Sequence, residues 1–377
     1  KIYRQIHQEG GRVMVLVPGQ MRSAADPNWE TEGKKWAVKT IAEGSIPETL
    51  HGTKLPAGNR GVTPAYVNVA ACYAPGFVVR YEYSNHFPAF EGSPIVFMCV
   101  SCEEWVSSNI LPAIERAVEL GADVVLIDGL SMISYLCFDQ QHGHSSPDKA
   151  QGPGAIRVME RVLELGRKYN PEFSICTEGI CDVYTPYIGW WHSRIGPAPE
   201  IFRYTLPWVE GITGNVIDVG DFDSLYQSFL CGLALDVELC VLHYVPSREL
   251  RVKRFSLDPG LAKEVKRLNQ LRQQNLDLLV DGVFRDSVGL RCTNGHLLVK
   301  CFAKKDEALT TYWYQGEEPA NAEVTVSLQQ LGVNLKQRQV KVFPSGRETV
   351  TVEFEAGQPT VKFEKLTKNS VGLVRLS

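Results

Sequence analysis

The chain has 377 residues, 44% hydrophobic and 22% charged, a composition typical of a globular protein with two or three domains. Its formal net charge is −4 and it has no long run of Lys or Arg, which argues against nucleic acid as the main partner. No apolar stretch approaches the roughly 18 residues of a membrane-spanning helix, so we expect no membrane insertion.

The ten cysteines show neither a paired Cys-x-x-Cys rhythm nor zinc-finger spacing. Cys99, Cys176 and Cys301 lie inside apolar runs, where cysteine behaves as a small hydrophobic residue. We therefore expect reduced, structural cysteines, which favours a reducing compartment such as the cytoplasm. The chain starts at Lys1 without a visible signal peptide, as a processed product or a fragment would.

From Arg12 to about Pro246 the sequence alternates continuous apolar runs with amphipathic patterns. The apolar runs lie at 13–17, 95–100, 123–128, 173–177 and 238–243. Because they lack polar alternation, they predict strands buried on both faces, as in a parallel sheet. Helical spacing predicts helices near 101–120, 154–165, 222–235 and 261–279, the first with a capping box at Ser101 and Glu104. This order predicts an α/β domain with right-handed crossovers.

The segment 19–94 is long, irregular and rich in Gly, Pro and aromatic residues. Structureless loops of that length are uncommon in compact domains and are usually functional. Two interpretations stay open for it: an insertion that covers a cleft, or a small subdomain with its own packing.

After about Asp281 the pattern changes to period-2 alternation, as in Val350, Val352 and Phe354. Such alternation over short runs predicts an antiparallel β-sandwich. We therefore expect one α/β domain over 1–280, with the insertion at about 19–94, and a β-sandwich over 281–377.

Two carboxylates stand at the ends of apolar runs. Asp128 ends the run 124–127, Glu178 ends the run 173–177, and a glycine follows each. In a parallel (β/α)8 barrel, catalytic side chains come from the carboxyl ends of the strands. Glycoside hydrolysis needs two such groups, one at the anomeric carbon and one that protonates the leaving oxygen. The alternative is that each is an ordinary strand-end acid, hydrogen-bonded to loop amides.

The stretches 121–128, 137–144 and 177–179, with 97–105 and 199–207 around them, resemble an uncharacterised family of glycoside-hydrolase-like (β/α)8 barrels, catalogued as a domain of unknown function. That family is similar to the endo-α-N-acetylgalactosaminidases and, more distantly, to the α-amylase superfamily. The resemblance covers roughly residues 10–280 and implies a (β/α)8 TIM-type barrel. It also implies that 199–207 forms the strand after the one that ends at Glu178.

The resemblance implies a retaining hydrolase for an α-linked glycoside, with Asp128 as nucleophile and Glu178 as general acid/base, and without a cofactor. The sequence departs from the α-amylase pattern twice: Leu126 replaces an arginine, and His243 stands where those enzymes have a third carboxylate. If 13–17 is the third barrel strand, the first two belong to an N-terminal segment or a second chain that completes the barrel. Alternatively, 19–94 supplies them.

Further residues are candidates for binding the carbohydrate. His142 and His144 could hydrogen-bond sugar hydroxyls; an His-x-His pair could also bind a metal, but the sequence offers no convincing third ligand, so we expect none. Adjacent tryptophans and a histidine after the Glu178 strand could stack on a sugar ring. The remaining candidates are Met21, Arg22, Asp26, Trp190, Trp191, His192, Arg203, Tyr204 and His243.

Two other functions stay open. A non-catalytic carbohydrate-binding protein on a degenerate barrel would have Asp128 and Glu178 pointing apart or sealed by their neighbours. A metal-dependent barrel hydrolase or lyase would hold a metal at His142, His144 or Asp128. No Gly-rich phosphate loop is present, which argues against nucleotide-dependent chemistry.

Overall fold

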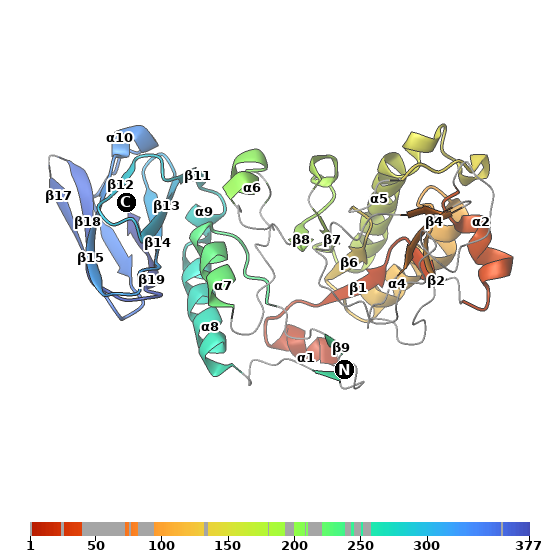
Figure 1. Cartoon of the computed structure of the whole chain (residues 1–377), viewed down its shortest axis with the longest axis horizontal. Coiled ribbons are helices and arrows are strands. Elements are labelled where there is room, and N and C mark those ends of the chain that lie inside the picture. The colour runs from red at the N-terminus through yellow and green to blue at the C-terminus, as the bar shows by residue number, and fades with distance from the viewer. Residues whose placement is uncertain are drawn as a thin grey trace. The chain divides into compact units, whose positions relative to one another are not determined.

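The computed structural model describes residues 2–23, 26–39, 72–74, 77–81, 94–131, 135–179, 181–192, 200–207, 209, 221–237, 243–244, 250–251, 258–355 and 357–377. The chain divides into two compact units (Figure 1). The first comprises Lys1–His192 and Val241–Val252, and the second Ser193–Cys240 and Lys253–Ser377. The second unit thus begins earlier than the residue 280 that we expected, because helices before that point pack on the C-terminal sheet. In the described part of the chain, no helix has the length and apolar character to cross a membrane.

The first unit contains a four-stranded parallel sheet in the order β1–β6–β7–β8. Its strands are β1 (Met14–Pro18), β6 (Val124–Asp128), β7 (Ser174–Glu178) and β8 (Trp190–His192). The strands predicted at 13–17, 123–128 and 173–177 are confirmed, whereas the sequence predicted none at β8. Among the described residues these four strands form an open parallel sheet, and a closed barrel is not seen there.

A second sheet of the first unit is antiparallel, in the order β2–β5–β4–β3. Its strands are β2 (Met21–Ser23), β3 (Cys72–Ala74), β4 (Phe77–Tyr81) and β5 (Pro94–Phe97). The prediction that 95–100 belongs to the parallel sheet is wrong, because β5 pairs antiparallel with β2 and β4. Three of these strands come from 19–94, and a π-helical turn and a short helix follow the first of them, so that segment has structure of its own. Residues 40–71 and 82–93 lie outside the described residues.

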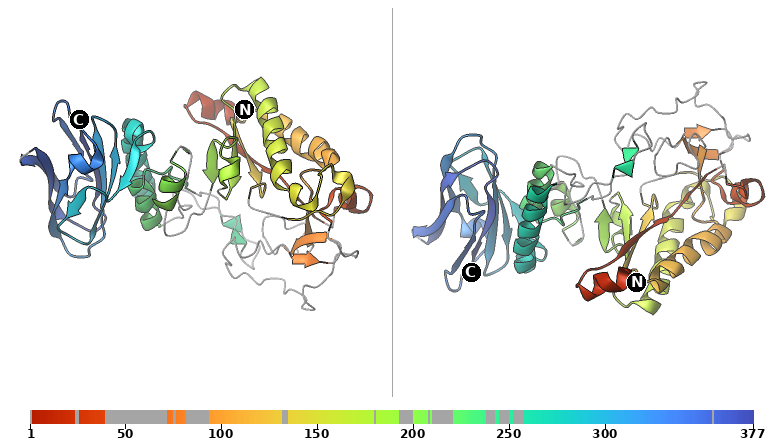
Figure 2. Two further views of the ribbon diagram at one scale, coloured as in Figure 1. Left: turned by 90° about the horizontal axis from the view of Figure 1, so that it is seen from above. Right: turned by 90° about the horizontal axis from the view of Figure 1, so that it is seen from below.

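Helices α4 (Leu111–Glu119) and α5 (Gly152–Tyr169) pack side by side and against the parallel sheet, α4 on β1 and α5 on β7 (Figure 2). A short helix α3 (Glu103–Trp105) and a π-helical turn Val106–Ile110 lead into α4. The capping box at Ser101 is wrong: its hydroxyl donates to the carbonyl oxygen of Ala150 at 2.7 Å, and the helix begins after Cys102.

Several short elements complete the first unit. They are α1 (Ile2–Gln8), a π-helical turn Trp29–Gly33, α2 (Lys34–Trp36), the 3-10 turns Gln140–His142, Pro147–Lys149 and Asp182–Tyr184, and the antiparallel pair β9 (His243–Tyr244) and β10 (Leu250–Arg251). Of the strand predicted at 238–243, only His243 is described, and it pairs antiparallel with β10. Its side chain lies outside the described residues.

The second unit begins, among the described residues, with helix α6 (Glu200–Thr205). The strand implied for 199–207 is therefore wrong. Three further helices, α7 (Phe222–Leu230), α8 (Pro259–Gln274) and α9 (Leu276–Leu279), lie near the predicted helices at 222–235 and 261–279.

Two antiparallel sheets form the rest of the second unit, in the orders β11–β13–β14–β19–β16 and β12–β15–β18–β17. Their elements are β11 (Val283–Asp286), β12 (Leu290–Cys292), β13 (Leu297–Ala303), β14 (Ala308–Tyr314), β15 (Ala320–Val326), α10 (Leu328–Leu331), β16 (Val340–Phe343), β17 (Thr349–Glu355), β18 (Gln358–Leu366) and β19 (Val371–Leu376).

Side chains along β14 point alternately to the two faces of the five-stranded sheet, and both faces are covered, so the whole strand is buried. Tyr312 and Tyr314 face the four-stranded sheet and join the core between the two sheets. Leu309 and Trp313 face the other way and pack with residues of α7, α8 and α9. The five-stranded sheet thus has one face against its partner sheet and the other under helices (Figure 1).

Candidate active site

Asp128 and Glu178 lie at the carboxyl ends of the neighbouring parallel strands β6 and β7. The pairing of β6 with β7 ends at Leu126 and Cys176, and continuing its register by two residues along both strands would bring Asp128 level with Glu178. Residues that are level on neighbouring strands point to the same face of a sheet. The two carboxylates therefore share one face at the end of the sheet where barrel enzymes place their catalytic groups.

His192 extends this row, because it pairs with Glu178 on the next strand, β8. Trp190 lies two residues earlier and faces the same way, whereas Trp191 points to the opposite face. The Trp191 side chain is 0% exposed. Of the three residues proposed as a sugar-binding cluster, Trp190 and His192 thus share the carboxylate face, and Trp191 is a core residue that cannot stack on a ligand.

The glycine after each carboxylate has a positive φ angle, 74° at Gly129 and 71° at Gly179. Residues with a β-carbon rarely adopt this left-handed conformation. Each strand therefore ends in a turn that glycine permits, and this turn directs the chain away immediately after the carboxylate.

Two polar side chains hold the turns in place. The Ser131 hydroxyl lies 2.8 Å from the Thr177 hydroxyl and 3.2 Å from the carbonyl oxygen of Gly179, so it joins the turn after β6 to the end of β7. Gln20 donates from Nε2 to the carbonyl oxygen of Gly129 at 2.8 Å. Sequence patterns could not select Ser131 or Gln20, since both act through contacts distant in the chain.

Solvent reaches the carboxylate face of the sheet. Asp128 and Glu178 are half-buried. Met14 and Leu16, which pair with Val124 and Leu126 and so point to the same face, are 46% and 60% exposed. Among the described residues the two carboxylates thus keep partial exposure, although Leu126 and Cys176 on the same face are buried.

Met21, Arg22 and Asp26 lie at and after β2. Both carboxylate oxygens of Asp26 are 3.1 Å from nitrogens of the Arg22 guanidinium, and this pairing lowers the pKa of Asp26. The guanidinium also lies 5.0 Å from the ring centroid of Trp36. Arg22 and Asp26 thus stabilise the segment after β2 through each other.

His142 and His144 lie with two cysteines. One ligand atom from each of Cys99, Cys137, His142 and His144 lies within 4.8 Å of the others. Hydrogen bonds with Cys99 and with His142 lower the pKa of the Cys137 thiol, while the hydrogen bond with Cys137 raises the pKa of the Cys99 thiol. The sequence presented only the two histidines as possible ligands, so it missed half of this cluster.

Arg203 and Tyr204 do not lie near a strand end as expected, because α6 is a helix. The Arg203 guanidinium is buried, donates to the carbonyl oxygen of Leu279 at 2.9 Å and lies 5.6 Å from the ring centroid of Phe302. The Tyr204 ring packs edge-on against Phe284 at 5.4 Å. Arg203 therefore packs inside the second unit, whereas Tyr204 is 51% exposed and contacts the unit at its surface.

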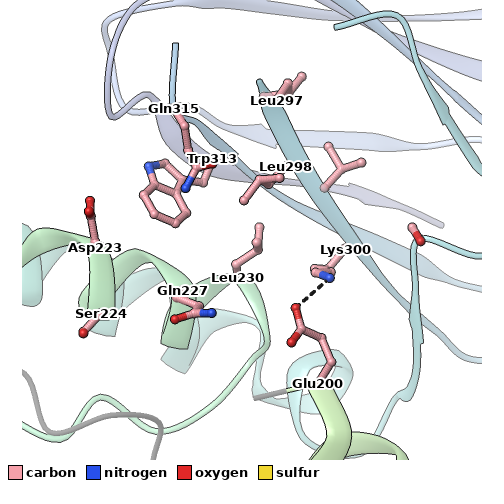
Figure 3. A pocket seen from close by; sticks show the side chains of 12 residues that line it. Glu200, Asp223, Ser224, Gln227, Leu230, Leu297, Leu298, Lys300, Trp313 and Gln315 are labelled. Atoms are coloured by element: carbon pink, nitrogen blue, oxygen red, sulfur yellow. Dashed lines mark ion pairs between the residues drawn. The ribbon is translucent and has the colours of Figure 1, made fainter. Parts of the chain in front are cut away.

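A cavity of about 560 Å³ lies in the second unit between helices and the five-stranded sheet (Figure 3). On its wall, Lys300 pairs with Glu200 at 2.8 Å and with Asp286 at 2.5 Å. Trp313 contributes an aromatic surface on another side. The only lysine of its lining is therefore neutralised by two carboxylates, and Asp128 and Glu178 do not line it.

No family model matches the chain, and no curated protein matches its sequence. Solved structures of similar fold include glycoside hydrolases, which are TIM-barrel glycosidases followed by a further domain. At identities of 10% to 14% this likeness establishes the fold.

Three of these structures illustrate the enzymes and the degree of similarity found. The α-amylase of Geobacillus thermoleovorans, solved with acarbose, has a TM-score of 0.58 and 12% identity over 100% of this chain and 79% of its own. A debranching enzyme of Nostoc punctiforme has a TM-score of 0.59 and 13% identity over 99% of this chain and 78% of its own. A GH36 alpha-galactosidase of Geobacillus stearothermophilus has a TM-score of 0.53 and 10% identity over 100% of this chain and 46% of its own.

Proposed function

We propose that this protein is a retaining glycoside hydrolase for an α-linked glycoside, with Asp128 as nucleophile and Glu178 as general acid/base. One observation carries the proposal: Asp128 and Glu178 end neighbouring parallel strands whose paired register, continued by two residues, brings the two carboxylates level at the carboxyl end of the sheet. The similar folds of an α-amylase and an alpha-galactosidase support an α-linked substrate.

The strand geometry favours retention over inversion. Neighbouring strands lie about 4.8 Å apart, so level side chains start at about that separation. Retaining enzymes hold their carboxyl groups about 5–5.5 Å apart, whereas inverting enzymes need about 6.5–9.5 Å to admit a water. Asp128 and Glu178 start from the shorter spacing.

The reaction then has two displacements. Asp128 attacks the anomeric carbon while the glycosidic bond breaks and Glu178 transfers its proton to the leaving oxygen. The Glu178 carboxylate next takes a proton from a water whose oxygen attacks the same carbon, and the ester bond to Asp128 breaks. In this proposal His192, which pairs with Glu178 on β8, hydrogen-bonds a sugar hydroxyl.

Azide rescue separates the two roles. A panel of aryl α- and β-glycosides first identifies a substrate of the wild type. With that substrate, Asp128→Ala in azide is expected to form a glycosyl azide of inverted anomeric configuration, because azide replaces the nucleophile. Glu178→Ala is expected to form one of retained configuration, because azide then attacks the glycosyl-enzyme. The anomer is assigned by proton NMR.

Glu172→Gln is the matched control, since this exposed acid precedes the first residue of β7, at the end of the strand away from Glu178. It should leave turnover within about twofold of wild type. Full activity of the Asp128→Ala or Glu178→Ala variant without azide would exclude the proposal, as would wild-type turnover with inversion.

A further inference from the structure

The side chains of Cys99, Cys137, His142 and His144 come together in the first unit from segments far apart in the chain. Their four ligand atoms lie within 4.8 Å of one another, and three of the four residues are buried. The Cys137 sulfur is 3.4 Å from Nδ1 of His142. In a tetrahedral zinc site, bond lengths of about 2.3 Å to sulfur and 2.0–2.1 Å to nitrogen place such a pair about 3.5 Å apart.

The His142 ring is already oriented as a ligand. Its Nε2 lies 2.6 Å from the carbonyl oxygen of Lys35, an acceptor only, so Nε2 carries the proton. Nδ1, which faces Cys137, is then the nitrogen with the free lone pair. Metal-bound histidines characteristically donate their other ring N–H to a carbonyl or carboxylate in this way.

His144 supplies an independent observation. Its Nε2 is buried, yet it finds no hydrogen-bond partner among the described residues. A buried polar atom without a partner costs free energy, and coordination of a cation is one way to offset it. The rings of His142 and His144 are 6.3 Å apart between centroids and nearly perpendicular, so they do not stack.

The backbone around the cluster is held on both sides. The Tyr135 hydroxyl donates to the carbonyl oxygen of Met98 at 3.1 Å and accepts from the backbone N–H of Val100 at 3.0 Å, so it clamps the residues that flank Cys99. Gly143 has a φ of 75°, and the left-handed turn it forms lies between the two histidines. The four side chains thus need little ordering before they bind.

We propose that Cys99, Cys137, His142 and His144 bind one Zn²⁺ ion that has a structural role. Two thiolates and two imidazoles match the soft, tetrahedral preference of zinc. Four protein ligands leave no open position for water or substrate, which distinguishes a structural site from a catalytic one. This site goes beyond the proposed hydrolase chemistry. It gives His142 and His144 a structural role as zinc ligands in place of the substrate-binding role expected from the sequence.

The ion would join two segments of the first unit, and the hydrogen bond of His142 to the Lys35 carbonyl oxygen would link them to a third. Cys99 follows β5, Cys137 and the histidines lie in the connection between β6 and α5, and Lys35 belongs to α2. Each thiol gives up its proton as the metal–sulfur bond forms, so zinc binding releases protons to solvent. The connection that follows the Asp128 strand would therefore depend on zinc for its conformation.

Metal analysis of the full chain tests the proposal directly. Protein purified without a metal-affinity step, in zinc-containing medium, is expected to hold about one zinc per chain. Zinc-free protein given Co²⁺ should show the visible absorption of tetrahedral cobalt and a thiolate-to-cobalt charge-transfer band. Cys137→Ser should weaken the charge-transfer band, and His144→Asn should lower the affinity, in competition with a chelator, by at least about tenfold.

Cys102→Ala is the matched control, since it removes a buried free cysteine close to Cys99 in the chain and should keep the full cobalt spectrum. Circular dichroism checks that each variant folds. The cobalt spectrum of the wild type tests the proposal even if a variant fails to fold. Folded wild-type protein that binds less than about one tenth of an equivalent of zinc or cobalt would overturn the proposal. A Cys99–Cys137 disulfide, detected by mass spectrometry in protein purified under reducing conditions, would also overturn the proposal.

Discussion

A β-carbon added to Gly19 would lie 2.6 Å from the carbonyl oxygen of Asp128, a separation that β-carbons do not adopt. The backbone after β1 thus passes directly against the residue that we propose as nucleophile. This approach is possible only for glycine, since the same β-carbon would also lie 2.7 Å from the side chain of Ile127.

Gly19→Ala should destabilise the protein by about 1–3 kcal/mol and lower kcat, because the end of β6 must shift to admit the methyl group. Thermal unfolding and turnover are measured together. Gly152→Ala is the control, because a β-carbon there would meet nothing within 4 Å. Unchanged stability in both variants would contradict the close packing of Gly19 on Asp128.

Substitution of Asp128 and substitution of Glu178 should reduce activity by amounts that depend differently on the leaving group of the substrate. Glu178→Gln removes the proton donor, so hydrolysis of poor leaving groups should fall by about 10²–10⁴-fold, and that of activated aryl glycosides much less. Asp128→Asn should slow both kinds of substrate strongly, because no glycosyl-enzyme can form. Kinetics with aryl glycosides of graded leaving-group pKa measure the difference, and equal dependence in both variants would argue against the assigned roles.

Glu348 should make the stability of the protein depend on pH. Burial would raise its pKa, but hydrogen bonds from Ser345 and Tyr312 outweigh that effect and lower it. A lowered folded-state pKa means that the stabilisation is present above the unfolded-state pKa and is lost as pH falls through the folded-state value.

Glu348→Gln should therefore cost about 1–3 kcal/mol at neutral pH and much less in acid, where the wild-type side chain is also protonated. Urea unfolding of the full chain at several pH values measures the difference. Glu353→Gln, at an exposed position on β17, should have little effect at any pH. A cost that does not vary with pH would show that the charge is unimportant.

Arg203→Met should lower the unfolding midpoint without changing kcat/KM. The substitution removes the donor to the carbonyl oxygen of Leu279, and leaving a buried acceptor unpaired costs about 1–3 kcal/mol. Ile201→Ala, exposed on the same helix, is the control. If kcat/KM fell instead while stability held, Arg203 would be a substrate-binding residue as the sequence suggested.

The strands that carry the carboxylates could be predicted because each is a continuous apolar run that ends in an acid and a glycine. The same reasoning placed the run at 95–100 in the wrong sheet, since apolarity indicates burial and does not reveal which strands pair. It also missed β8, where only three residues are extended, Trp190–His192.

The cysteine–histidine cluster could not be predicted for a different reason. Cys137, His142 and His144 are close in sequence, but Cys99 lies 38 residues before Cys137 and reaches them only through the end of β5. Likewise, the sequence of residues 199–207 does not distinguish a strand from a helix. In the structure the segment is a helix whose Arg203 side chain is buried in the second unit.

The pairing of β1 with β6 joins Met14 to Val124, positions that are 110 residues apart in the chain (124 − 14). Loop-closure entropy rises only with the logarithm of loop length, so lengthening or shortening the intervening sequence changes equilibrium stability little. The rate responds differently, because long-range strand pairing is slow to form. We therefore expect β6, β7 and β8, which are closer in the chain, to associate before β1 joins the sheet.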